Sequence, residues 1–324
     1  GSDICIATLS TSSFVVVYEG TGNTGIRAKA CTVSGTTISV GSETVLYNPG
    51  GSVIGTSDDL FACRVDTNKG MTVFGDDTNS AFGTAIAFTV SGTTISAGSV
   101  HVFTSIGMAN PGADEFYGSS THVLVTYINS TTIYGQILSI SGTTVSSGSA
   151  ISISATVDTK DNSRCLGLTA TTALIVYELD SGTRAGKVTQ VSRSGTTLTA
   201  SGTINDWSTS TGSNIPHGLT RISDTVAIIV YYAGTGVLKE QAKEIQVVGT
   251  SANPGVALDL DDPGDNVNVG CAVVNATTAI AIYQTTQVAV LTTSLITVSS
   301  VTHIWLSIDG AATFTNIGDP TWAA

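Results

Sequence analysis

Short apolar runs that end on an aromatic residue recur along the whole chain, with the aromatics 50–56 residues apart. The six runs cover residues 14–18, 71–74, 123–127, 174–177, 228–231 and 280–283. They are largely apolar at consecutive positions instead of alternating with polar residues, which is typical of strands covered on both faces. The pattern predicts six repeats, each containing one such strand.

A second marker has the sequence Val-Ser-Gly-Thr-Thr-Ile-Ser-x-Gly-Ser. It begins at Val33 and Val90, returns with small changes at Ile140, and has a weaker form at Arg193. Ser-Gly between two strand-like stretches indicates a tight hairpin, because glycine supplies the positive φ that the turn requires. Each repeat is therefore predicted to hold four short strands. In the first repeat these strands are 4–9, 14–18, 26–33 and 37–46.

Four-stranded repeats of this length are typical of propellers, in which neighbouring sheets cover both faces of each blade. A β-solenoid would use shorter repeats, and a pair of sandwiches would not repeat six times. We predict an all-β fold: a six-bladed β-propeller of four-stranded antiparallel blades in a single domain, residues 3–324. The expected blades are 3–50, 51–107, 108–155, 156–209, 210–262 and 263–307, with a C-terminal hairpin and tail at 303–324. Residues 1–2, Gly-Ser, are interpreted as a remnant of cloning.

Composition excludes several classes of protein. Only 11% of the 324 residues are charged and 41% are hydrophobic, which argues against a disordered chain. The net charge of −12 opposes binding to phosphate backbones, so we expect no nucleic acid partner. Apolar runs stay well below the roughly 20 residues that span a bilayer, so membrane insertion is not expected. The five cysteines include no C-x-x-C pair and predict buried packing residues instead of a disulfide framework or zinc site.

The sequence also lacks the motifs of common enzymes. G-x-S-x-G, H-E-x-x-H and the P-loop are absent, and the four histidines fall in different repeats. The six arginines share no repeat position, whereas a sialidase needs several that converge on a carboxylate. The chain is therefore predicted not to be an enzyme.

Acidic residues gather in segments expected to be loops that lead into the first strand of a repeat. One explanation is that turns favour Asp for the bonds its side chain makes to the backbone. A polar ligand is a second, with Asp58, Asp59, Asp114, Glu115 and Asp161 as candidate binding residues. A Ca²⁺ ion is a third, because it binds oxygen ligands, and the candidate ligands are Asp259, Asp261, Asp262 and Asp265.

Trp207 is a further candidate binding residue. Glycan-binding propellers usually present aromatic platforms in each blade, whereas the three tryptophans here do not share a repeat position. Trp207 is either a lone sugar-stacking ring or a partly exposed packing residue.

Residues 77–98 resemble repeats of marine bacteriophage tail and virion-associated proteins. The resemblance lies in a Gly-Thr-Ala-aliphatic strand that begins at Gly83, followed by the Val-Ser-Gly-Thr turn at Val90. It implies a structural or adhesive module of a virion, such as a tail-fibre or appendage component. The implied partners are other virion proteins or a glycan or protein of the host surface, and the implied location is the virion or the extracellular space.

Residues 307–314 resemble a degenerate Asp-box, the hairpin turn of sialidase-type propellers. Ser307, Asp309, Thr313 and Phe314 match its pattern, and Ala311 stands where glycine is usual. The resemblance implies a structural turn between the last two strands and no active site.

These observations leave three functional hypotheses in order of preference. The first is a non-enzymatic adhesion propeller from a phage virion, without a required cofactor. The alternative is a carbohydrate-binding, lectin-like propeller of a secreted bacterial protein. The second alternative is a degenerate glycoside hydrolase, which would require two carboxylates facing each other in a pocket.

Overall fold

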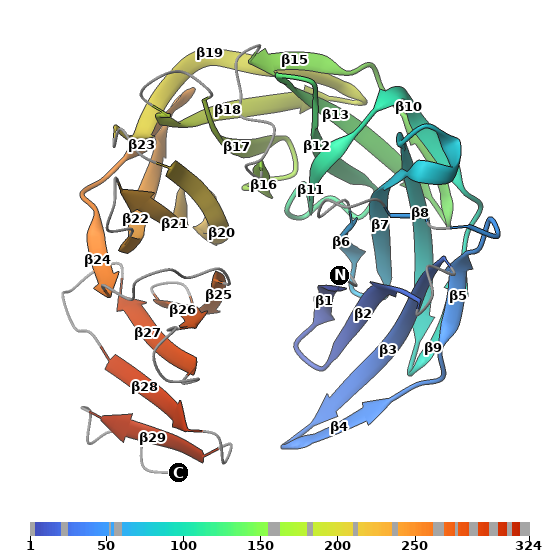
Figure 1. Ribbon diagram of the computed structural model, residues 1–324, viewed down its shortest axis with the longest axis horizontal. Helices are drawn as coiled ribbons and strands as arrows, with labels where there is room; N and C mark the ends of the chain where they lie inside the picture. The colour runs from blue at the N-terminus through green and yellow to red at the C-terminus, as the bar shows by residue number, and fades with distance from the viewer. Residues whose placement is uncertain are drawn as a thin grey trace. The chain divides into compact units, whose positions relative to one another are not determined.

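The computed structural model describes residues 4–20, 25–51, 53–54, 60–154, 163–179, 184–209, 213–234, 239–261, 269–275, 278–284, 291–297, 304–309 and 313–317. Within them the chain forms strands β1 to β29 and one short 3₁₀ helix, Asp77–Asn79 (Figure 1). None of the helical segments in these ranges is long and apolar enough to cross a membrane.

The first three repeats each form one sheet of five strands. The first sheet contains β1 (Ile4–Ser10), β2 (Ser13–Glu19), β3 (Ile26–Ser34), β4 (Thr37–Val40) and β5 (Thr44–Tyr47). The second contains β6 (Leu60–Asp66), β7 (Lys69–Asp76), β8 (Phe82–Ser91), β9 (Thr94–Ala97) and β10 (His101–Gly107). The third contains β11 (Ala109–Glu115), β12 (His122–Asn129), β13 (Thr132–Ser141), β14 (Thr144–Ser147) and β15 (Ile151–Ser154).

The remaining three sheets follow in chain order. The fourth contains β16 (Arg164–Gly167), β17 (Thr172–Glu178), β18 (Gly186–Ser194) and β19 (Thr197–Ser208). The fifth contains β20 (Ser213–Ser223), β21 (Val226–Gly234), β22 (Lys239–Val248), β23 (Ser251–Pro254) and β24 (Leu258–Asp261). The sixth contains β25 (Val269–Asn275), β26 (Thr278–Gln284), β27 (Leu291–Thr297), β28 (Ile304–Asp309) and β29 (Thr313–Ile317).

One sheet per repeat, six times along the chain, confirms the predicted fold class: an all-β, six-bladed β-propeller with antiparallel blades. The chain divides into two compact units, Gly1–Ala173 with Val191–Ala200, and Leu174–Gln190 with Ser201–Ala324. The first three sheets belong to the first unit, the last two sheets to the second, and the division passes through the fourth sheet. At the place of the expected last hairpin, β28 pairs with β29 from Trp305 to Asp309.

The expected burial of the second strand on both faces is confirmed in the second, third and fourth sheets, whereas β2 in the first sheet alternates between buried and partly exposed positions. Strands β7, β12 and β17 are buried at almost every position, on both faces. In the first unit these strands contribute to two apolar cores. One lies between the first and second sheets and the other between the second and third.

The predicted fourth strand is interrupted in four of the six sheets. In the first sheet the expected strand 37–46 is divided into β4 and β5, which both pair with β3. The interruption falls at the second glycine of the repeated motif, Gly41, whose N–H donates to the carbonyl oxygen of Ala30 at 2.8 Å. The equivalent Gly98 and Gly148 bond in the same way to Ala87 and Ile137.

The two motif glycines are required for different reasons. The first, at Gly35, Gly92, Gly142 and Gly195, has a φ of +58° to +62° with open space around it. The second has no room for a side chain, because a Cβ at Gly98 would meet the carbonyl oxygen of Thr143 in the next sheet. The first glycine therefore makes the turn, and the second lets adjacent sheets approach closely.

We expect Gly98→Ala to lower the free energy of unfolding by about 1–3 kcal/mol, since the added methyl group must displace the backbone of the third sheet. Denaturant unfolding monitored by circular dichroism measures the effect. The control is Gly107→Ala in the same sheet, where the nearest atoms lie 3.8 and 3.9 Å from the added Cβ. That variant should remain within about 0.5 kcal/mol of the parent chain. If both variants lost the same free energy of unfolding, the close approach at Gly98 would not be the cause.

Candidate functional site

A cavity of about 260 Å³ lies between the first and second sheets. Its walls come from the β1–β2 and β6–β7 turns and from the ends of β3 and β8. The lining residues are Ser12, Ser13, Thr32, Val33, Thr67, Asn68, Val90 and Gly92. None of them is charged. The cavity therefore offers hydroxyl and amide groups, which can donate and accept hydrogen bonds, beside two aliphatic side chains.

The walls of this cavity are held by backbone bonds within each sheet. The N–H of Val33 donates to the carbonyl oxygen of Ser12 at 2.8 Å, and the N–H of Val90 donates to that of Asn68 at 2.8 Å. The Asp66 carboxylate accepts from the backbone N–H of Thr67 at 2.7 Å and fixes the β6–β7 turn. The lining is thus positioned by the main chain.

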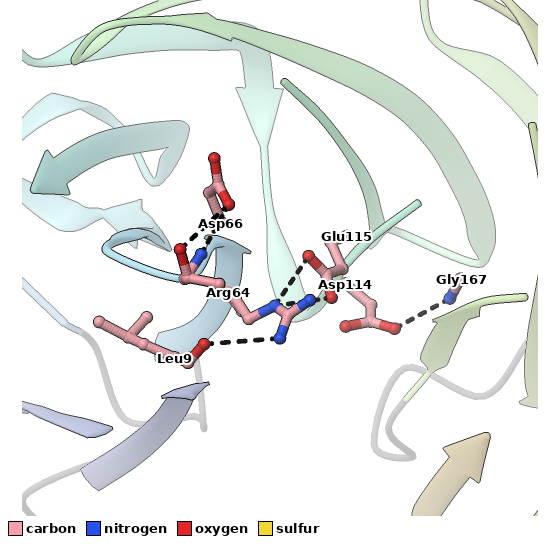
Figure 2. Close-up of polar contacts among 7 residues, drawn as sticks. Leu9, Arg64, Asp66, Asp114, Glu115 and Gly167 are labelled. Carbon is pink, nitrogen blue, oxygen red and sulfur yellow. Dashed lines mark hydrogen bonds and ion pairs between the residues drawn. The ribbon is translucent and has the colours of Figure 1, made fainter. Parts of the chain in front are cut away.

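A second polar cluster joins the first strands of four consecutive sheets (Figure 2). Arg64 on β6 donates through Nε to the Glu115 carboxylate on β11, with the nearer oxygen at 2.9 Å. Its Nη1 donates to the carbonyl oxygen of Leu9 on β1 at 3.4 Å. Asp114, next to Glu115, accepts through Oδ2 from the N–H of Gly167 on β16 at 2.9 Å. Arg64 and the two acids therefore connect strands β1, β6, β11 and β16.

Burial raises the pKa of Asp114 to about 7, and the neighbouring Glu115 carboxylate acts in the same direction. The hydrogen bonds from the N–H groups of Gly167 and Glu115, and the charge of Arg64, oppose the shift. Burial likewise raises the pKa of the Cys63 and Cys165 thiols. These thiols are protonated at neutral pH, which makes them poor nucleophiles.

The cysteines lie where the sequence indicates packing residues. All five lie outside any disulfide, and Cys5, Cys63, Cys165 and Cys271 are on the first strands of their sheets. The Cys5 thiol donates to the carbonyl oxygen of Leu60 on the next sheet at 2.9 Å.

The structure brings only part of the predicted acidic site together. Asp58, Asp59, Asp161, Asp262 and Asp265 lie outside the described residues. Asp259 and Asp261 are on β24, with their backbone placed and their pairing to β22 defined. Among the residues that the structure describes, no three His, Cys, Asp or Glu side chains could hold a metal ion. The Ca²⁺ site stays a prediction.

The expected loop position of Asp114 and Glu115 is wrong. Both lie at the end of strand β11, where they pair with Leu124 and Val123 of β12. Glu115 is engaged by Arg64, and Asp114 by Gly167. Both acids thus make bonds within the chain, and their role in ligand binding stays a prediction.

Trp207 has no exposed face on which a sugar could stack. Its side chain is fully buried. The indole N–H donates to the carbonyl oxygen of Lys187 at 2.8 Å, and its ring lies edge to face with Tyr231 at 4.7 Å between centroids. Gly186 is adjacent, and a Cβ there would overlap the indole ring. Trp207 is a core residue of the second unit, which corrects both the sugar-stacking and the partly exposed interpretations.

The cavity residues were not among the sequence candidates. Serine, threonine and asparagine are abundant in this chain, and no single one differs from its neighbours. The only signal was positional, because Ser12 and Asn68 precede the second strand in equivalent places of adjacent repeats. Only the packing of two sheets shows that these positions face a shared cavity.

Comparison with protein-family models finds no match, and no curated protein sequence matches the chain. Several solved structures are similar. The BP39L lectin from Burkholderia pseudomallei aligns over 97% of this chain and 84% of its own, with a TM-score of 0.61 and 9% identity. A mutant of the Aleuria aurantia lectin, in complex with α-methyl-L-fucoside, aligns over 98% of this chain and 94% of its own, with a TM-score of 0.50 and 12% identity.

A prolyl endopeptidase structure is also similar, with a TM-score of 0.53 and 11% identity. The alignment covers 92% of this chain but only 40% of the endopeptidase. At sequence identities of 9–12%, these similarities define only the fold class, a β-propeller. The function has to be argued from the geometry of the site.

Proposed function

We propose that this chain is a non-enzymatic, carbohydrate-binding β-propeller, and that the cavity between the first two sheets holds one neutral sugar residue. The observation that carries the proposal is the uncharged lining of hydroxyl and amide groups beside Val33 and Val90. Sugar hydroxyl groups both donate and accept, as do the side chains of Ser12 and Asn68. The aliphatic side chains match the C–H surface of a pyranose ring.

The size of the cavity supports a small ligand. About 260 Å³ lies just under the range of roughly 300–1,000 Å³ that is usual for pockets of drug-sized ligands. A single sugar ring suits this volume better than an extended oligosaccharide. Two of the similar structures are lectins, so sugar binding has a precedent on this fold.

Two features favour binding over catalysis. No carboxylate lines the cavity, whereas glycoside hydrolysis commonly uses a pair of them across the scissile bond. Asp114 and Glu115, which are not part of the lining, bond to Gly167 and Arg64, respectively. The degenerate-hydrolase hypothesis therefore has no support from the described residues. A virion location stays a prediction from the repeat resemblance, and a glycan on a host surface would fit an adhesive module of that kind.

We expect a glycan array probed with the intact chain to give neutral monosaccharide or terminal-sugar hits, to be followed by calorimetric titration with the matching methyl glycoside. The double variant Thr67→Ala with Asn68→Ala should bind about tenfold more weakly, because two hydrogen-bonding groups of the lining are lost. The backbone bonds that hold the turn are retained in this variant.

Thr225→Ala is the matched control. The carbonyl oxygen of Thr225 accepts from the N–H of Val247, so Thr225 holds the place of Asn68 in the fifth sheet, and it is not among the residues that line the cavity. The affinity of Thr225→Ala for the methyl glycoside should equal that of the parent chain. The proposal fails if the array gives no carbohydrate hit, or if the double variant and the control bind equally well.

A further inference from the structure

One backbone hydrogen bond recurs at the same place in successive sheets and identifies equivalent residues. The N–H groups of Val33, Val90, Ile140 and Arg193 donate to the carbonyl oxygens of Ser12, Asn68, Thr121 and Thr171, respectively, at 2.8–2.9 Å. The first two donors line the sugar cavity. The fifth sheet repeats the bond with Val247 and Thr225 at 2.8 Å, so four of these five donors are aliphatic, and Arg193 in the fourth sheet is the exception.

The Arg193 side chain extends from the fourth sheet to the third. Its Nε donates to the carbonyl oxygen of Ala170 at 2.7 Å, and Nη1 donates to that of Gly195 at 3.2 Å. Its Nη2 donates to Ser119 Oγ in the β11–β12 connection at 3.3 Å. The guanidinium carbon lies 5.1 Å from the centroid of the Phe116 ring, a cation–π contact.

Two of the partners of Arg193, Ala170 and Gly195, are the counterparts of cavity-lining residues. Ala170 precedes Thr171 as Thr67 precedes Asn68, and Gly195 follows the strand end as Gly92 does. Val90 is short and leaves the space between the first two sheets open. Arg193 takes the position of Val90 and fills the corresponding space between the third and fourth sheets with a side chain bonded on both sides.

We propose that Arg193 closes a second sugar site, equivalent to the cavity between the first and second sheets, and thereby limits the number of sugars that this unit binds. The inference rests on the proposed function, because it assigns the same ligand class to the equivalent position. Thr121 and Thr171 supply hydroxyl groups in the places of Ser12 and Asn68. The neighbouring Ile140 supplies an aliphatic surface in the place of Val33.

The test is a calorimetric titration of Arg193→Val with the methyl glycoside that the parent chain binds. Valine is the residue that the second repeat carries at this position, so the stoichiometry should rise by one sugar per chain. Combining Arg193→Val with Thr67→Ala and Asn68→Ala should retain the added site while weakening the original one. Arg221→Val, which removes an arginine from an ion pair with Asp224, is the control and should add no site.

A second measurement does not depend on any sugar. Burial and the positive charge of Arg193 lower the pKa of His122, whose Nδ1 lies 2.9 Å from Thr121 Oγ1. Removing the arginine should raise the pKa of His122, which an NMR titration of its ring protons measures. If Arg193→Val folds poorly, Arg193→Gln can replace it. This variant shortens the side chain and removes its charge, so it should also raise the pKa of His122.

The outcomes separate the two proposals. Failure of the parent chain to bind any sugar would overturn the proposed function and this inference with it. Sugar binding by the parent chain with an unchanged stoichiometry in folded Arg193→Val would overturn the inference alone. An unchanged pKa of His122 would show that Arg193 does not lie across the two sheets, and would overturn the inference independently of any ligand.

Discussion

Gly167→Ala should destabilise the chain by at least about 3 kcal/mol, the largest effect of a single methyl group that we expect. A Cβ at Gly167 on β16 would overlap the carbonyl oxygen of Glu115 on β11. It would also lie 2.8 Å from the backbone nitrogen of Tyr117. These atoms belong to the main chain and cannot rotate away. Relief therefore requires β11 and β16 to separate, which would also break the bond from the Gly167 N–H to Asp114.

Gly118→Ala distinguishes this steric effect from backbone strain. Gly118 has a φ of +81° and no atom within 4 Å of an added Cβ, so its substitution costs only the left-handed conformation, about 1–2 kcal/mol. Urea unfolding of both variants, with the slope of the transition compared as well as its midpoint, measures the difference. A Gly167→Ala variant no less stable than Gly118→Ala would contradict the close approach of these two strands.

The features that local sequence determines were predictable. The repeat period and the hairpin position depend on residues close together in the chain, such as Ser34-Gly35 with its positive φ. The consecutive apolar residues that end at Phe74 and Tyr127 indicated strands buried on both faces, and both aromatics are fully buried. A repeat also strengthens every such inference, since each pattern is observed several times.

The features that depend on contacts between repeats were not predictable. At the break between β4 and β5, Gly41 lies too close to Thr93 for a Cβ, and Thr93 belongs to the next repeat and the next sheet. The same limit applies to the acids. Asp114 and Glu115 were expected in a loop that leads into the first strand, but they lie within β11 and pair with β12.

The candidate site illustrates this limit most directly. Its lining comes from four segments of two repeats, and each contributes residues that would be ordinary on any β-rich surface. Because the repeats are equivalent, such a site can recur between several pairs of sheets. One substitution at an equivalent position can remove it from a single pair. Arg193 at the place of Val90 is such a change. Asymmetry in a repeat protein can therefore be located by comparing equivalent residues and finding the exception.

The stability of the chain should fall between pH 4 and pH 7 because of Asp114, and Asp114→Asn should remove this fall. The pKa of Asp114 is raised from the ordinary value of 3.8 to about 7 in the folded chain, chiefly by burial. Between these values the folded chain retains a proton that the unfolded chain releases. Unfolding thus becomes more favourable as the pH rises, by up to about 4 kcal/mol across this range.

Asparagine keeps an oxygen that can accept from the Gly167 N–H and carries no charge. The stability of Asp114→Asn relative to the parent chain should therefore increase from pH 4 to pH 7 and then level off. Urea unfolding of both chains at pH values from about 4 to about 8 measures this difference. Cys165→Ser, beside Asp114, is the control; its thiol is protonated throughout this range because burial raises its pKa. The control curve should run parallel to that of the parent chain. A parallel curve for Asp114→Asn would instead show that the pKa of Asp114 is not raised in the folded chain.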